Sequence, residues 1–212
     1  MSFNEITTPV YYRSIQLMFS QKPINDGMNE LNEVVRNLIP HPIWDKLRRI
    51  NYDGELPQLK EWIGKEISSH QYDVSILLFS LSDLGDVISL YFLRQEREPN
   101  GESDWGAYDD NFFSVIPSKV LEQMYELAEA ELSDGRGGYT NYDVRWIVET
   151  CYPLAYAGLI IGEIIQTLPV NILLGKDVMR RVAIFFAEGD DFFFGEITGQ
   201  GFKYYTIPDF VS

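Results

Sequence analysis

The sequence predicts an α+β fold, in which a mostly antiparallel or mixed sheet of about five to six strands packs with helices. Two observations carry this prediction. Apolar residues recur at helical spacing in several stretches, whereas short β-rich apolar runs occur in the middle of the chain and near its C-terminus. With 45% hydrophobic and 14% aromatic residues, the 212-residue chain has enough apolar material for a sizeable core.

Four elements are expected in the N-terminal third. The stretch from Val10 to Phe19 alternates apolar and polar residues, which predicts a strand. Asp26 is placed as the N-cap of a helix that Pro40 ends. The stretch from Ile43 to Ile50 predicts a second, short helix, and Pro57 suits the first turn of a third.

Two strands are expected to pair in the middle of the chain. Val74 to Leu81 and Val87 to Leu93 are apolar, β-rich runs joined by a short polar turn at Ser82 to Asp86. Both runs are apolar enough for burial on two faces, which predicts central strands. The next stretch, Arg94 to Asn111, is a long polar loop that contains glycine, and loops of this length are commonly functional or mobile.

Helical patterns return after this loop. Pro117 is expected to open a helix with glutamates on its outer face, and Ser133 to Asn141 is expected to be a glycine-rich turn. A further helix is expected to start at Asp143 and to be kinked or broken by Pro153. The stretch from Leu154 to Leu168 is apolar nearly all round, which predicts a buried helix against the sheet.

The C-terminal part predicts a β-hairpin. Arg181 to Ala187 and Phe192 to Ile197 are β-rich runs on either side of a polar turn at Glu188 to Asp191. Phe202 to Ile207 is a candidate for a last strand. These runs complete the expected sheet.

A few further features indicate domain organisation and compartment. The chain has no internal repeat or linker, so residues 1–212 are expected to form one domain, with a boundary in the 96–115 loop as the alternative. Cys151 is the sole cysteine, which excludes an internal disulfide and suits a reducing compartment. Residues 1–13 do not form a secretory signal, and the longest uncharged apolar stretch, 150–162, falls short of the roughly 20 residues that span a bilayer. We therefore expect a cytoplasmic protein.

The charge of the chain indicates its class of partner. There are 17 basic and 32 acidic residues, a formal net charge of −15, and residues 96–143 hold 12 of the acidic residues against three basic ones. Such a field repels nucleic-acid phosphates and anionic lipids, so neither nucleic acid nor a membrane is an expected partner. It attracts a basic protein. The alternative is that these acids only solvate a helix face and a polar loop.

Common catalytic and cofactor-binding signatures are missing from the sequence. His41 and His70 are the only histidines and do not form a one-turn zinc pair, and there is no Gly-x-Ser-x-Gly nucleophile motif. Cys151, in an apolar helical stretch, is expected to be an inert core residue. Gly135 to Gly138 and Gly199 to Gly201 do not match phosphate-binding loops and are expected to be turns. No cofactor or metal site is therefore expected.

Pairs of carboxylates leave one enzymatic alternative open. Asp109 and Asp110 stand in the long loop, and Asp190 and Asp191 stand at the tip of the predicted hairpin. Such pairs serve glycosidases or bind divalent ions, so a carboxylate-dependent hydrolase or metal-binding enzyme is the alternative function. Adjacent aspartates are also common in turns, and their spacing here matches no calcium loop.

Aromatic residues set among acids form the candidate partner-binding surface. Trp and Tyr side chains are good anchors at protein interfaces, and carboxylates around them add steering and specificity. The candidate residues are Glu102, Asp104, Trp105, Tyr108, Asp109 and Asp110 in the long loop, supported by Glu122 and Glu126 on the following helix.

The sequence thus predicts a non-enzymatic acidic protein that binds a basic partner, such as an immunity-like or antitoxin-like inhibitor of a bacterial toxin. Two other interpretations stay open. In one, the aromatic residues of the loop fill the core. In the other, the chain is a regulatory or scaffold subunit that associates through an apolar interface.

Overall fold

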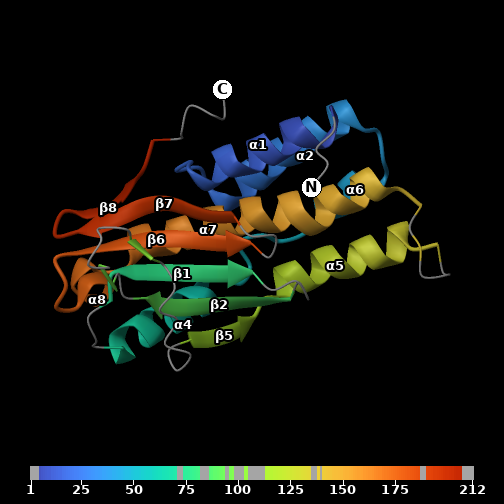
Figure 1. The fold of residues 1–212 in the computed structure, drawn as a ribbon. Coiled ribbons are helices and arrows are strands. Elements are labelled where there is room, and N and C mark those ends of the chain that lie inside the picture. The colour runs from blue at the N-terminus through green and yellow to red at the C-terminus, as the bar shows by residue number, and fades with distance from the viewer. Residues whose placement is uncertain are drawn as a thin grey trace.

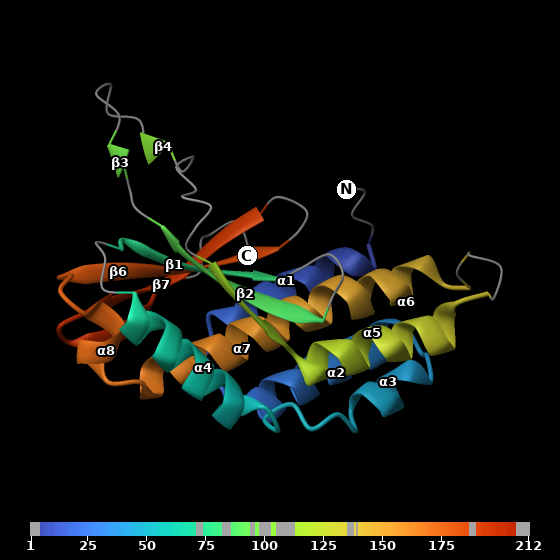
Figure 2. The same ribbon diagram turned by 90° about the horizontal axis from the view of Figure 1, so that it is seen from below.

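The fold is that of a computed structural model, which describes residues 5–70, 74–81, 86–93, 96–97, 103–104, 113–134, 138, 140–186 and 190–206. The helices lie on one face of a six-stranded mixed sheet (Figures 1 and 2). A separate two-stranded ladder stands on the other side of that sheet (Figure 2). The predicted α+β class is confirmed.

The elements follow in chain order along the described residues. The helices are α1 (Thr7–Met18), α2 (Ile24–Leu38), α3 (Ile43–Leu47), α4 (Leu56–Ser69), α5 (Lys119–Leu132), α6 (Tyr142–Trp146), the π-helical segment η1 (Ile147–Cys151), α7 (Tyr152–Thr167) and α8 (Val170–Leu174). The strands are β1 (Ile76–Leu81), β2 (Val87–Leu93), β3 (Glu96–Arg97), β4 (Ser103–Asp104), β5 (Phe113–Pro117), β6 (Met179–Phe186), β7 (Asp190–Thr198) and β8 (Gly201–Tyr204).

The main sheet has the strand order β5-β2-β1-β6-β7-β8. Neighbouring strands are antiparallel except β1 and β6, which are parallel. A parallel pair needs a crossover connection, and here the chain between β1 and β6 passes through α5, α6 and α7. The apolar runs of β1 and β2 correctly predicted two interior strands that pair with each other.

The first element is α1, so the strand expected at residues 10–19 is wrong. The buried residues of this segment recur at helical spacing, and Ser14 Oγ donates to the carbonyl of Val10, one turn earlier, at 2.8 Å. α1 packs along α7 at the small residue Gly158. This packing overrides the local alternation of apolar and polar residues.

Three expected helices of the N-terminal third are confirmed as α2, α3 and α4. Asp26 is not the N-cap of α2, because the helix begins directly after Pro23, and Asp26 lies in its first turn. An acidic side chain in the first turn still suits the positive end of the helix dipole. Pro57 lies in the first turn of α4, as predicted.

The sequence pattern does not predict β5, and Pro117 is the last residue of this strand rather than the start of a helix. α5 begins instead after Ser118, whose Oγ accepts a hydrogen bond from the Leu121 N–H at 3.2 Å. Serine suits this position because its hydroxyl satisfies one of the free N–H groups in the first turn.

Pro153 does not break the helix in which it lies. α6, η1 and α7 follow one another without interruption, and η1 widens the turn before Pro153, with the Tyr152 N–H donating to the Ile147 carbonyl. Proline has no N–H for the carbonyl four residues earlier, that of Glu149, and its ring crowds that carbonyl. Tyr125 Oη of α5 donates to this oxygen at 3.1 Å. The π-turn and the tyrosine hydroxyl together accommodate the proline.

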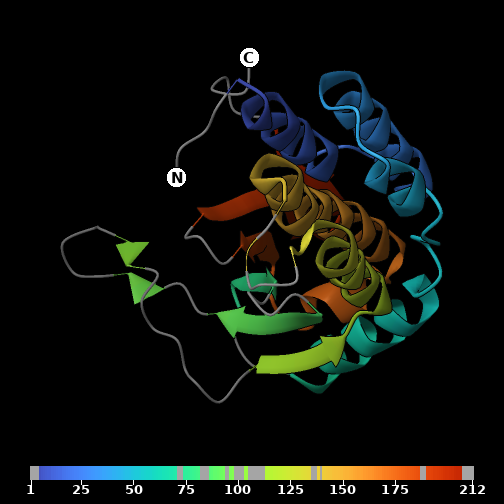
Figure 3. The ribbon, with the colours of Figure 1, turned by 90° about the vertical axis from the view of Figure 1, so that its right-hand side faces the viewer.

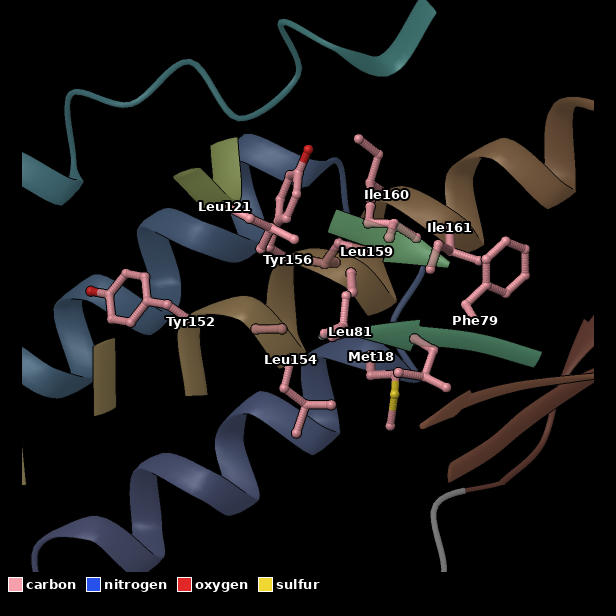
Figure 4. Packing of buried hydrophobic residues seen from close by; sticks show 14 of the residues in the cluster. Met18, Phe79, Leu81, Leu121, Tyr152, Leu154, Tyr156, Leu159, Ile160 and Ile161 are labelled. Atoms are coloured by element: carbon pink, nitrogen blue, oxygen red, sulfur yellow. The ribbon is translucent and has the colours of Figure 1, made fainter. Parts of the chain in front are cut away.

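α7 forms the centre of the core, as its apolar sequence predicts. It contacts α1 and α2, α4 and α5, and the strands β6 and β8. Figure 4 shows its side chains Leu154, Tyr156, Leu159 and Ile160 near Met18 of α1 and Phe79 and Leu81 of β1. A Cβ built on Gly158 would lie 2.6 Å from Met18 Cα, so only glycine allows α1 and α7 to approach this closely.

Within the described part of the chain, the helical run from Tyr142 to Thr167 is long and apolar enough to cross a membrane. This helical run is longer than the uncharged apolar stretch at residues 150–162, because the helix continues through Glu149 and Glu163. The most apolar stretch of 18 residues in this helical run is 89% buried inside the protein. A helix that is apolar all round and covered by protein on every side is typical of a core helix.

The predicted C-terminal hairpin is confirmed as β6 and β7, and β8 adds a last strand. Phe194 is fully buried between the sheet and the helices. Gly201 opens β8 with φ at +111°, where other residues are strained, so the β7–β8 turn does need one glycine. The other expected glycine turn, at residues 135–138, lies largely outside the described residues.

Candidate functional site

The connection between β2 and β5 holds most of the predicted site residues. Within it the structure describes β3 and β4, an antiparallel ladder that pairs Glu96 with Asp104 and Arg97 with Ser103. The ladder therefore places two acidic residues, Glu96 and Asp104, at directly paired positions. The other predicted residues of this connection lie outside the described residues: Glu102, Trp105, Tyr108, Asp109 and Asp110.

The predicted glutamates of α5 are accessible. Glu122 and Glu126 are exposed, while the apolar side of the same helix is buried in the core. Neither has an ion-pair partner among the residues that the structure describes. Two other glutamates of α5 are engaged in ion pairs, Glu129 with Arg145 and Glu131 with Lys46. Glu122 and Glu126 are thus the α5 glutamates whose charges are not neutralised by a neighbour.

Asp104 does not lie beside the α5 glutamates. The β3–β4 ladder and α5 are on opposite sides of the sheet and toward opposite ends of it (Figures 2 and 3). The acidic central third of the chain therefore contributes to two separate surfaces. The first lies near β3 and β4, and the second is the outer face of α5.

β5 lies between β4 and α5 in the sequence. Its exposed residues are a part of the site that the sequence did not predict. Phe113 is 52% exposed and Val115 is 45% exposed. The rings of Phe113 and Tyr91, which are paired across β5 and β2, stack with centroids 5.5 Å apart. On the helix side of β5, Trp62 Nε1 donates to Ser114 Oγ at 3.1 Å. Residues 113–117 form a run too short to distinguish a strand from an irregular segment by their sequence pattern.

On the sheet face that is turned away from the helices, apolar residues occur in β1, β2, β6 and β7 as well as in β5. Four buried residues form a cluster there, and three half-buried aromatic residues pack against it. The buried residues are Ile76, Leu78, Leu93 and Ala183, and the aromatic residues are Tyr91, Phe185 and Phe193. Because Tyr91 also stacks on Phe113, this apolar face extends to the exposed side chains of β5.

Glu55 is a buried carboxylate that fixes the junction between β5 and α5. It accepts hydrogen bonds from Ser118 Oγ at 2.5 Å, from the Lys119 N–H at 2.8 Å and from Tyr156 Oη at 2.5 Å. Burial raises the pKa of Tyr156, and the nearby Glu55 carboxylate raises it further, so this hydroxyl stays a hydrogen-bond donor. The sequence could not reveal this role, because the partners come from distant parts of the chain.

The histidines and the cysteine have structural contacts. Cys151 is fully buried, and burial raises the pKa of its thiol, as expected for an inert core residue. His41 Nδ1 accepts a hydrogen bond from the Ile43 N–H at 3.2 Å. His70 ends α4 and stacks on Phe92 with ring centroids 4.1 Å apart. Over the described ranges, His, Cys, Asp and Glu side chains do not gather in a group of three that could hold a metal ion.

The carboxylate pairs of the enzymatic alternative are placed only in part. Asp190 and Asp191 are the first two residues of β7, where they pair with Phe186 and Phe185. Asp109 and Asp110 are not among the described residues. The enzymatic alternative therefore stays a prediction.

A small pocket of about 270 Å³ lies between the end of α4 and α8. Its lining residues are Ile67, Ser68, His70, Asn171, Ile172, Gly175 and Lys176. None of these residues is acidic, so the pocket is separate from the acidic surfaces.

Comparison of the chain with known protein families, with curated proteins and with solved structures gave no match.

Proposed function

We propose that this protein is a non-enzymatic, acidic binding protein that engages a basic protein partner. The observation that carries the proposal is the concentration of negative charge. Between Glu96 and Asp143 there are 12 acidic and three basic residues, in a chain of net charge −15. A field of this sign raises the local concentration of a cationic partner and speeds its encounter with the protein.

The outer face of α5 supports a role in steering. Glu122 and Glu126 are exposed and have no ion-pair partner among the described residues, so their charges add to the external field. Exposed charges of this kind contribute little free energy to a single contact, because water and salt screen them. Their expected contribution is to the association rate and to its salt dependence.

The basic partner is proposed to contact the segment of the chain that connects β2 and β5. Trp105 and Tyr108 are the proposed anchors, because large aromatic residues carry much of the binding energy at interfaces. The acids proposed to surround them are Glu102, Asp104, Asp109 and Asp110. The connection leaves and re-enters the sheet beside Tyr91 and Phe113, so an apolar surface is available at its base.

More specifically, we propose that the protein is an immunity-like or antitoxin-like inhibitor that acts in the cytoplasm on a basic bacterial toxin. Such an inhibitor needs a stable fold, an acidic surface with aromatic anchors and fast association. It needs no catalytic group of its own.

Affinity capture from an extract of the native cell tests the proposal. The tagged protein is loaded at about 50 mM salt and washed at about 300 mM salt, which shortens the Debye length from about 14 to about 6 Å. We expect a protein with a high isoelectric point to be retained at the lower salt concentration and released at the higher one. Retention of no basic protein at low salt would contradict the proposal.

Matched variants show whether the acidic segment is responsible. Two charge-reversed variants, Asp109→Lys/Asp110→Lys and Glu122→Lys/Glu126→Lys, are expected to lower retention of the partner. The control is Glu33→Lys/Asp53→Lys, which changes the net charge equally at exposed acids outside the acidic segment. If all three variants retain the partner equally well, the proposal loses its physical basis.

A further inference from the structure

The outer edge of β5 presents backbone groups that pair with nothing in the described sheet. β5 is the last strand on its side, and β2 is its sole neighbour among the described strands. The Ser118 N–H donates to the Asp86 carbonyl at 2.7 Å, and this bond makes the last pair of the ladder, at Pro117, a non-hydrogen-bonded one. Because the two kinds of pair alternate, Phe113 and Val115 also occupy non-hydrogen-bonded pairs, and their N–H and C=O groups point to the outer edge.

The side chains at this edge are apolar and exposed. Phe113 and Val115 expose about half of their surface, and β5 contains no charged residue. Edge strands are usually protected from pairing by charged side chains, by proline or by a covering element. Among the described residues, the protection of this kind that β5 itself carries is Pro117, at its end. A strand added at this edge would satisfy the free backbone groups and cover both side chains.

The charge of the chain indicates which kind of strand would bind at the outer edge of β5. The segment that contains β5, residues 96–143, has 12 acidic and three basic residues. Pairing two copies through β5 would bring together two chains that each have a net charge of −15, and their repulsion would oppose it. A strand that carries Lys or Arg is attracted by the same field.

We infer that β5 accepts an extended segment of the partner as an additional strand, in which Lys or Arg alternates with apolar residues. The inference rests on the proposed function, which supplies the basic partner, and it adds the form of the contact. The apolar residues of the added strand cover Phe113 and Val115, while backbone hydrogen bonds form along the outer edge. The cations of the added strand lie in the field of the acidic segment.

A peptide of about seven residues with alternating Val and Lys is the probe for this pairing. Backbone amide exchange is followed by NMR while the peptide is titrated. In the free protein, the amides of Ser114 and Ile116 are expected to exchange slowly, because they bond to β2, and those of Phe113 and Val115 rapidly. At saturation, exchange at Phe113 and Val115 is expected to slow by about tenfold or more. Unchanged exchange at both amides, or protection along β8 instead, would overturn the inference.

A second peptide separates backbone pairing from simple charge attraction. It has the same sequence and charge, but its alternate amides are N-methylated on the side that would face β5. We expect its affinity to fall by about tenfold, because it cannot complete the ladder. Equal affinity of the two peptides would mean that only charge is recognised, which overturns the inference and leaves the proposed function standing.

Variants of the strand complete the test. Val115→Pro removes an outward N–H without breaking a bond to β2, and we expect about a tenfold loss of peptide affinity. Val115→Thr keeps the N–H and is expected to bind within about threefold of the parent. If Val115→Pro does not weaken binding of the peptide, the inference fails, whatever the effect of Glu122→Lys/Glu126→Lys. The proposed function fails separately, if affinity capture retains no basic protein. A concentration-dependent dimer in sedimentation that Val115→Pro abolishes would assign the edge to a second copy and overturn the inference.

Discussion

β5 and β8 form the two edges of the same six-stranded sheet, and they leave different groups exposed. Along β8, Phe202 and Tyr204 are half-buried and in ring contact with each other, and the exposed residue between them is Lys203. Along β5, the exposed residues include Phe113 and Val115, and the strand has no charge. A lysine in the middle of an edge strand is a common protection against pairing, whereas exposed apolar residues favour it.

The β8 edge is also attached to the core. Tyr204 Oη accepts a hydrogen bond from Gln166 Nε2 at 3.0 Å and lies close to Gly162 of α7. Phe202 packs over Gly195 of β7 and contacts the buried Phe194. β8 is therefore packed against the core, whereas the outer edge of β5 is the one proposed to bind the partner. Substitutions at β8 should cost stability, and substitutions at the outer edge of β5 should cost little stability and affect binding.

The largest expected effect tests which groups of β5 face outward. Ile116→Pro removes a backbone bond to β2 and a buried side chain, and should lower the free energy of unfolding by about 3 kcal/mol or more. Val115→Pro removes an outward N–H and should cost about 1 kcal/mol, mainly through the restricted φ of proline. Urea unfolding followed by circular dichroism measures both variants. Similar losses in the two would show that the edge of β5 is not as open as described.

The next effect tests the closed edge. A Cβ on Gly195 would lie 2.3 Å from Phe202 Cε2 and 2.8 Å from the backbone oxygen of Lys203. Gly195→Ala should therefore lower the free energy of unfolding by about 2 kcal/mol, because the backbone of β8 must shift. The control is Gly199→Ala in the β7–β8 turn, where a Cβ meets nothing within 4 Å. The control should change stability by no more than about 0.5 kcal/mol. A Gly195→Ala protein as stable as its control would show that β8 is not tightly packed on β7.

A smaller effect at β8 depends on pH. Burial raises the pKa of Tyr204 to about 12, although the hydrogen bond from Gln166 opposes this shift. Below pH 10 the tyrosine is protonated in both folded and unfolded states, so its contribution is constant. Between about pH 10 and pH 12 only the unfolded state loses this proton, and stability should fall by up to about 1.4 kcal/mol per pH unit for this group.

Tyr204→Phe isolates this contribution. The variant should lose about 1 kcal/mol at neutral pH with the hydrogen bond to Gln166, and its decline above pH 10 should be shallower than that of the parent. Urea unfolding at several pH values between 8 and 11 is the measurement. Parallel curves for the two proteins would mean that Tyr204 is not protected from ionisation at this edge.

The smallest expected effect on stability is at the exposed side chains of β5. Val115→Thr should change the free energy of unfolding by no more than about 0.5 kcal/mol, because the side chain is 45% exposed and threonine suits a strand. Thermal unfolding by calorimetry measures the change. A loss as large as that of Gly195→Ala would show that β5 stabilises the fold as β8 does, and would remove the contrast between the two edges.

The sequence predicted the elements whose own periodicity determines them. Their apolar runs were sufficient to predict the strands β1, β2, β6 and β7. The all-round apolar pattern of α7 was sufficient to predict a buried helix. The pattern of α1 was not, because its alternation is compatible with a strand, and its place against Gly158 of α7 depends on tertiary packing. Glu55 shows the same limit, since its burial depends on Ser118 and Tyr156.

The candidate site was predictable to a similar extent. The outward position of Glu122 and Glu126 follows from helical spacing, and the structure places both on the exposed face of α5. Their separation from Asp104 does not follow from sequence, because it depends on which side of the sheet the β3–β4 ladder stands. β5 was missed because it has only five residues, too few for their pattern to identify a strand.

The association rate of the purified protein with its captured partner tests the central claim most directly. Stopped-flow measurements between about 50 and about 300 mM salt compare the parent with Glu122→Lys/Glu126→Lys and with the control Glu33→Lys/Asp53→Lys. We predict that the parent and the control lose about tenfold or more of their rate constant over this range, and that the α5 variant starts slower and changes less. A rate constant that is independent of salt, and equal in all three proteins, would contradict a binding surface that acts through the acidic segment.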